Sequence, residues 1–246
     1  MPSASARAGS CIVDRIELAK VRLPRTAAAY PMKTRLTVAG VFSLLCCAAA
    51  LAQELTPAEK ERATEHLRAT QAALLASVDA LTPEQWNFKP GPDRWSIGNV
   101  VEHLAATELQ MLGMVETQVM KAPARTESVD VSELDGQILQ GIADRSFKVK
   151  APEALVPTNR FGSPQAALQA FRDVRARTLA FLANTPDLRG HATDSPLGQQ
   201  LDAYQWLLFI SAHCERHTKQ IVEVKTDANF PAAPGSSAKP STGARQ

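Results

Sequence analysis

Residues 96–120 read "SIGNVVEHLAATELQMLGMVETQVM", and this stretch indicates the fold class clearly. Its apolar residues recur at steps of three and four, which places them along one broad face of a helix. Ser96 stands at the start, where a serine side chain accepts a hydrogen bond from a free backbone N–H group. The apolar positions are Ile97, Val100, Val101, Leu104, Met111, Leu112, Met114 and Val115. A helix with so wide an apolar face must pack against other elements.

Three further stretches, at 56–81, 163–185 and 201–225, have the same helical spacing of apolar residues. The first begins with Thr56 and Pro57, and the second with Ser163 and Pro164, which are typical first residues of helices. No alternation of apolar and polar residues of useful length is present. The sequence therefore predicts an all-α protein, with these helices forming a four-helix bundle.

A long connector, residues 121–162, separates the second predicted helix from the third. It contains three prolines, and residues 132–147 within it have a pattern that predicts one short helix. Connections of this length in compact domains are usually functional or mobile.

The N-terminal residues have the pattern of an export signal. From Met32, a short basic region with Lys33 and Arg35 precedes the apolar run 36–49, and small residues precede Gln53. The apolar run is short for a membrane span, so residues 32–52 predict a cleaved signal peptide that leaves no stable membrane anchor. Residues 1–31 are either a long extension of that signal or a mis-assigned start, with Met32 the true initiator.

The remaining chain divides simply. Residues 53–228 are expected to form the bundle domain, and residues 229–246 are expected to be disordered because Pro, Ala, Ser and Gly dominate them. Cys214 is the one cysteine after residue 53, so the mature chain has no intramolecular disulfide. We expect a bacterial periplasmic or secreted protein.

The charge distribution argues against nucleic-acid binding. The chain has a formal net charge of +2, but residues 1–52 hold seven basic and two acidic residues, which leaves a mildly acidic body. The body has no clustered stripe of Lys and Arg, which nucleic-acid binding surfaces usually have.

Three histidines lie on semi-apolar faces of the predicted helices. His213 and His217 are four residues apart and therefore share one face, and His103 lies on the inward face of residues 96–120. Bundle cores are places where helices build metal sites, but a histidine on an apolar face is more often a hydrogen-bonded core residue. Spacing alone leaves both interpretations open, because it does not show that the two helices are neighbours.

Two stretches resemble a known family. "RWSIGNVVEHLAATE" (94–108) and "LDAYQWLLFISAHCERHTKQI" (201–221) resemble the second and the closing helix of DinB-like proteins, and residues 144–175 resemble the connector and third helix of one branch. The resemblance implies a DinB/YfiT-like four-helix bundle, here an exported member, and many such proteins pair as homodimers. It also implies a divalent metal, Zn²⁺ or Ni²⁺, bound by His103, His213 and His217.

The resemblance implies that the protein is a metal-dependent enzyme that acts on a small molecule, either as a hydrolase or as a thiol transferase-like enzyme. Three histidine ligands leave coordination positions open, which is the catalytic arrangement. Thiol transfer depends on a cytoplasmic thiol pool, so hydrolysis fits an exported protein better. The alternatives are a non-catalytic exported bundle that binds a metal or ligand, and a bundle whose histidines are structural.

The last helix restricts the mechanism. Cys214, and not a glutamate, follows His213, and Glu215 points away from the ligands, which argues against a zincin-type protease. Two residues near the ligand face are candidates for supporting roles. Arg216 either binds an anionic substrate, pairs with a carboxylate such as Glu102, or is an exposed charge. Gln220 is expected to orient a ligand histidine.

The remaining chemically notable residues receive simpler interpretations. Trp95 and Trp206 are expected to anchor the core, and Cys214 to be buried. His66 is expected to be exposed on the first helix, and His191 to lie in a loop away from the site. The expected lid residues of the connector are Asp144, Arg145 and Arg160.

Overall fold

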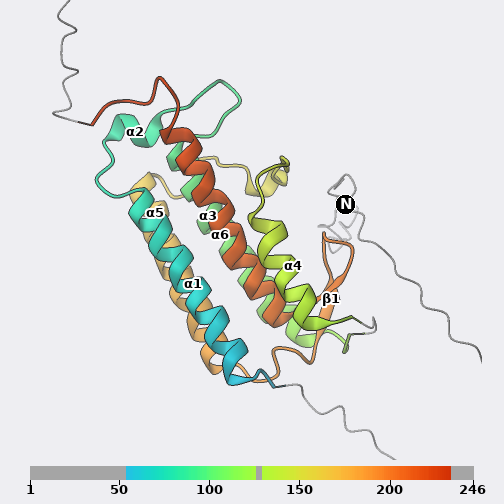
Figure 1. Cartoon of the computed structure of the whole chain (residues 1–246). Helices are drawn as coiled ribbons and strands as arrows, with labels where there is room; N and C mark the ends of the chain where they lie inside the picture. The colour runs from blue at the N-terminus through green and yellow to red at the C-terminus, as the bar shows by residue number, and fades with distance from the viewer. Residues whose placement is uncertain (1–53, 126–128, 234–246) are drawn as a thin grey trace, which may run out of the picture.

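The computed structural model describes residues 54–125 and 129–233, and these form a helical bundle (Figure 1). The long helices are α1 (Pro57–Ser77), α3 (Ile97–Thr117), α5 (Pro164–Asn184) and α6 (Ala203–Lys225). The shorter elements are α2 (Pro83–Asn87), η1 (Val119–Lys121), α4 (Val131–Ala143), η2 (Glu153–Leu155), β1 (Ala192–Asp194) and β2 (Gln200–Asp202). The four long helices confirm the predicted four-helix bundle.

Each long helix begins where its sequence supplies a cap for free backbone N–H groups. The Ser96 hydroxyl accepts from the Asn99 N–H at 3.2 Å, and the Asn99 side chain accepts from the Ser96 N–H at 3.2 Å. Thr56 and Asp202 make the same reciprocal arrangement at the starts of α1 and α6. Ser163 caps α5 in front of Pro164. These caps define the helix starts through residues that are close together in the sequence.

Helices α3 and α5 run in the same direction. Gly98, at the start of α3, lies so close to Pro164, at the start of α5, that an added Cβ would be 3.2 Å from the proline ring. Helices α1 and α6 are also parallel to each other. Where both helices begin, the Tyr204 hydroxyl of α6 donates to the Glu59 carbonyl of α1. At the other end, the Lys225 ammonium donates to the Ser77 carbonyl.

The parallel pair α3 and α5 explains the long connector. After α3 ends, the chain has to return along the whole bundle before α5 begins. Helix α4 makes that return beside α6, on the side away from α1 (Figure 1). The predicted short helix at 132–147 is thus present, and it ends at Ala143 because the segment after it turns toward α3.

The elements that were not predicted from the sequence include helix α2 and the hairpin of strands β1 and β2. Helix α2 begins at a capping box of Thr82 and Gln85 and buries Trp86. Strands β1 and β2 pair in antiparallel fashion, with Thr193 opposite Leu201. Both elements are too short for periodicity to reveal them, and tertiary contacts hold them in place.

Arg189 connects α1, α4 and β2 at the end of the bundle where strands β1 and β2 lie. Its guanidinium, 2% exposed, lies 2.6 Å from Asp135 of α4, 3.1 Å from Asp202 of β2 and 2.6 Å from Glu59 of α1. Arg125, before α4, adds a second ion pair to Asp202 at 3.1 Å. Buried carboxylates remain charged only where such partners compensate their lost hydration.

Several expectations concern segments at the ends of the chain. The proposed signal peptide, the preceding 31 residues and residues 234–246 lie outside the described residues. Within the tail that was expected to be disordered, Phe230 packs edge-on against Phe88 with ring centroids 5.5 Å apart. Across residues 54–125 and 129–233, no helix combines the length and hydrophobicity that crossing a bilayer requires.

A buried ion pair lies in the middle of the bundle. Arg175 of α5 is 0% exposed and donates twice to Glu108 of α3, both at 2.8 Å. The same guanidinium donates to Thr70 and to the Leu67 carbonyl of α1, and Thr178 donates to Glu108 at 2.8 Å. Three helices are therefore joined by one fully hydrogen-bonded pair.

We expect Glu108→Gln to lower the free energy of unfolding by about 3–5 kcal/mol, because it leaves the buried Arg175 charge uncompensated. The matched control is Glu116→Gln, which breaks the exposed pair of Glu116 and Arg177 at 3.4 Å. This control should change stability by less than about 0.5 kcal/mol. Urea denaturation measures both, and equal effects of the two variants would contradict a structural role for the buried pair.

Candidate metal centre

Three histidines meet in the core where α3 crosses α6. His103 comes from α3, and His213 and His217 come from successive turns of α6. Their ring centroids are separated by 5.1, 4.7 and 4.4 Å, and one nitrogen from each lies within 4.8 Å of the others. The packing of α3 against α6 supplies the adjacency that the sequence spacing left open.

Hydrogen bonds fix the tautomers of two of these rings. Nδ1 of His103 donates to the Leu155 carbonyl at 2.9 Å, and Nδ1 of His217 donates to Oε1 of Gln220 at 2.7 Å. A neutral imidazole carries one N–H, so Nε2 of both rings retains its lone pair. These are the protonation states that metal ligation requires.

The spacing of the nitrogens fits a small divalent metal. Nε2 of His103 lies 3.3 Å from Nε2 of His213. Two nitrogens at about 2.0–2.1 Å from a tetrahedral metal are separated by roughly 3.3 Å. His103 and His217 are buried, whereas His213 is partly exposed, so the group has one side toward solvent. The three residues therefore have the chemistry, the tautomers and the spacing to hold an ion.

Burial keeps all three imidazoles neutral. Desolvation lowers the pKa of His103, and it lowers the pKa values of His213 and His217 well below the ordinary range. Repulsion between the rings, which would be positive if protonated, lowers the pKa values of His213 and His217 further. Neutral rings near pH 7 are ready to bind a cation without first losing protons.

Aromatic rings line the histidine cluster. Trp95 lies with its ring centroid 4.9 Å from that of His103 and stacks on His217 at 6.3 Å. Phe209 stacks on His213 at 6.4 Å. Trp95 is partly exposed and packs against the core as expected, and its ring also contacts the histidine cluster. Trp206 is buried as expected, at 3% exposure.

Arg216 does not pair with Glu102, and it is only 8% exposed. Its guanidinium donates to the backbone carbonyls of Ile142, Asp144 and Phe147, at and just after the C-terminal end of α4. Carbonyls at a helix end have no partner within the helix, and a cation there is favourable. Arg216 therefore fastens the connector to α6, which corrects the exposed-charge and Glu102-pairing interpretations.

Glu215 points away from the histidine cluster, toward His66 at 3.6 Å and Lys219 at 2.7 Å. Contrary to expectation, His66 is partly buried, and its Nδ1 lies 2.5 Å from the Ser211 hydroxyl. The sequence around His66 is polar, so only the packing of α1 on α6 reveals this contact. Cys214 is fully buried, as expected.

The remaining candidates are placed elsewhere or have structural partners. His191 contacts the Ala122 carbonyl through Nδ1 and lies apart from the cluster. Of the three expected lid residues, Arg145 pairs with Glu223 at 2.5 Å and Arg160 with Glu102 at 3.2 Å. Asp144 accepts from Ser146. Each of these three side chains thus has a partner in the connector or on α3 or α6, and none lies open over the site.

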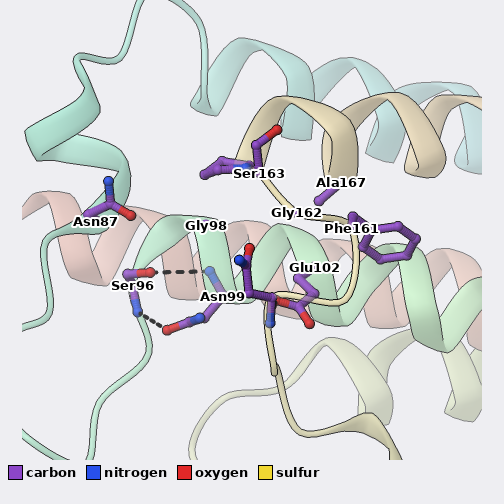
Figure 2. A pocket seen from close by; sticks show the side chains of 11 residues that line it. Asn87, Ser96, Gly98, Asn99, Glu102, Phe161, Gly162, Ser163 and Ala167 are labelled. Carbon is purple, nitrogen blue, oxygen red and sulfur yellow. Dashed lines mark hydrogen bonds between the residues drawn. The ribbon is translucent and has the colours of Figure 1, made fainter.

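Two hollows flank the connector. One, of about 310 Å³, lies where the starts of α3 and α5 meet, and Figure 2 shows the bonded pair of Ser96 and Asn99 at its edge and Glu102 further along α3. The other, of about 370 Å³, lies beside Leu155, whose carbonyl bonds Nδ1 of His103, and none of the three histidines lines it. Its lining is mainly apolar, and Arg160 contributes a charge.

The buried neutral imidazoles predict a pH dependence of stability. Because their pKa values are lower in the folded chain than the usual 6.5, the unfolded chain binds protons first as the pH falls. The free energy of unfolding of the metal-free protein should therefore decrease below about pH 6.5, by about 1.4 kcal/mol per pH unit for each such proton. Urea titrations between pH 7.5 and 5.5 measure it. His213→Gln/His217→Gln should show a shallower decrease, and an equally steep one would refute the assignment.

Comparison with known proteins identifies the family of this chain. The model of the DinB superfamily matches residues 66–221. The uncharacterized protein YuaE of Bacillus subtilis (strain 168) is 30% identical over 149 residues, which cover 60% of this chain and 88% of YuaE. The structure of YfiT from Bacillus subtilis, described as "a probable metal-dependent hydrolase with an unusual four-helix bundle topology", is 15% identical with a TM-score of 0.44, covering 70% of this chain and 89% of that chain. The superfamily match spans more than half of the sequence, and the protein therefore belongs to the DinB superfamily.

Proposed function

We propose that this protein is a metal-dependent enzyme that acts on a small molecule at a site formed by His103, His213 and His217. The observation that carries the proposal is the tautomer arrangement, in which Nδ1–H groups of two rings are held by acceptors outside the cluster. Their Nε2 lone pairs are then available to a common ion. Histidines that only stabilise the core would not have to bring one nitrogen from each of three rings within 4.8 Å of the others.

The residues of the chain have distinct roles in this proposal. His103, His213 and His217 hold a divalent ion, with Zn²⁺ or Ni²⁺ preferred by three imidazole nitrogens. When bound, such an ion acts as a Lewis acid and lowers the pKa of water or of a thiol. Gln220 and the Leu155 carbonyl orient two of the ligand rings, and the aromatic wall of Trp95 and Phe209 excludes water from their faces.

Protein carboxylates take no direct part in the proposed reaction. Glu215 faces His66 and Lys219, and Glu102 is bonded to the connector, so neither is placed as a general base for the cluster. A zincin-type peptidase mechanism needs a glutamate beside its histidine ligands. Because thiol transfer depends on a cytoplasmic thiol pool and we expect an exported protein, we favour hydrolysis of a small activated substrate, with thiol transfer as the second reaction class.

We place the substrate in the hollow of about 370 Å³ that Leu155 lines, because the Leu155 carbonyl on its border bonds His103. Leu109 and Phe161 make its lining apolar, and the Arg160 guanidinium at its edge is already paired with Glu102. Such a lining suits a compact, largely apolar molecule.

Metal content gives the primary test. We expect near-stoichiometric Zn or Ni in the purified protein by elemental analysis, and a higher melting temperature after addition of either ion. His213→Ala/His217→Ala should lose both properties, because one imidazole cannot retain the ion. His191→Ala is the matched control and should behave as wild type. Metal-free wild-type protein without a melting shift would overturn the proposal.

Turnover separates an enzyme from a non-catalytic binding bundle. Metal-loaded protein would be assayed on activated esters and amides, and with small thiols plus an electrophile. Activity lost with a chelator, restored by the ion and absent in His213→Ala/His217→Ala would identify the reaction class. Stoichiometric metal with no turnover on either panel would favour the binding bundle.

A further inference from the structure

The connector contacts α3 at two consecutive residues, Glu102 and His103. The buried Glu102 carboxylate accepts the backbone N–H groups of Thr158, Asn159 and Arg160 at 2.8, 2.9 and 3.0 Å. His103 donates from Nδ1 to the Leu155 carbonyl, a few residues earlier in the connector. Glu102, the residue before His103, therefore binds the same segment of the connector whose Leu155 carbonyl bonds His103.

Three successive N–H groups converge on Glu102 because of a turn after Pro157. Asn159 has a φ of 63°, in the left-handed region that asparagine tolerates better than most residues. Successive N–H groups in such a turn form a concavity that suits an anion. In Figure 2, Glu102 projects from α3 toward this segment of the connector, near Asn99 and Phe161.

Arg160 extends the contact to Leu155. Its Nε donates to Glu102 at 3.2 Å, while its two terminal nitrogens donate to the carbonyls of Ala154 at 3.1 Å and Val156 at 2.8 Å. The carbonyls on either side of Leu155 are thus held by one guanidinium. The Leu155 carbonyl between them is directed to His103 at 2.9 Å.

We propose that Glu102 and Arg160 are positioning residues for His103, which hold the Leu155 carbonyl against Nδ1 and so fix the tautomer with Nε2 unprotonated. The consequence for metal affinity rests on the proposed metal site, whereas the tautomer itself does not. Partners that orient a ligand histidine commonly change metal affinity by about 10–100-fold when they are removed.

The test uses Arg160→Gln and Glu102→Gln in the otherwise intact protein. Nitrogen-15 NMR of the imidazoles in metal-free protein reports which nitrogen of His103 carries the proton, with the signal assigned through His103→Gln. We expect the wild type to be protonated at Nδ1 and both variants to show a mixture of tautomers. The dissociation constant for Zn²⁺ should rise by about 10–100-fold in both variants.

Glu223→Gln is the matched control. It removes the ion pair of Glu223 with Arg145, which also fastens the connector to the bundle but does not touch the Leu155 segment. The control should leave the His103 tautomer and the Zn²⁺ dissociation constant unchanged. A general loosening of the connector would instead shift all three variants equally, and that result would overturn the proposal.

Two other outcomes are also decisive. If His103 keeps its Nδ1 proton in Arg160→Gln, the positioning role is refuted, whatever Glu102→Gln shows. Arg160 is partly exposed, so this variant decides the matter even if Glu102→Gln does not fold. If the wild type binds no Zn²⁺, the proposed metal site fails, while the tautomer measurement still decides the role of Glu102 and Arg160.

Discussion

The parallel arrangement of α3 and α5 is the constraint on which the rest of the structure depends. Gly98 and Pro164 bring the starts of the two helices together, so the chain between them has to travel the length of the bundle. Helix α4 makes this return along α6, and the remaining connector crosses over to α3. That path delivers the Leu155 carbonyl to His103. In a simple up-and-down bundle, short loops would leave this face of the cluster uncovered.

Two residues of opposite charge, each next to a candidate ligand, attach the connector. Glu102, beside His103, accepts backbone N–H groups, and Arg216, beside His217, donates to backbone carbonyls. Both side chains are buried, and charge-assisted hydrogen bonds offset the cost of removing them from water. The same two residues thus connect the covering segment to the helices that carry the histidines.

Several side chains adopt roles that local sequence context does not reveal. Arg216 has polar neighbours in the sequence, yet it is buried because the end of α4 presents free carbonyls to it. His66 lies on a polar stretch of α1, but Ser211 of α6 meets its ring. Trp95 precedes a helix cap, and the stacking on His217 follows only from the approach of α6. In each case the partner is more than 60 residues away in sequence, beyond the reach of periodicity or capping rules.

The sequence by itself determined the helices and their starts, because apolar spacing and capping residues act within a few residues of one another. It also placed His213 and His217 on one face, since a step of four residues is slightly more than one helical turn. Only the tertiary structure decided that His103 joins them, that Nδ1 of His103 and of His217 carries the proton, and which residues hold the connector. Those features depend on helix directions and on contacts between distant segments, which local patterns do not encode.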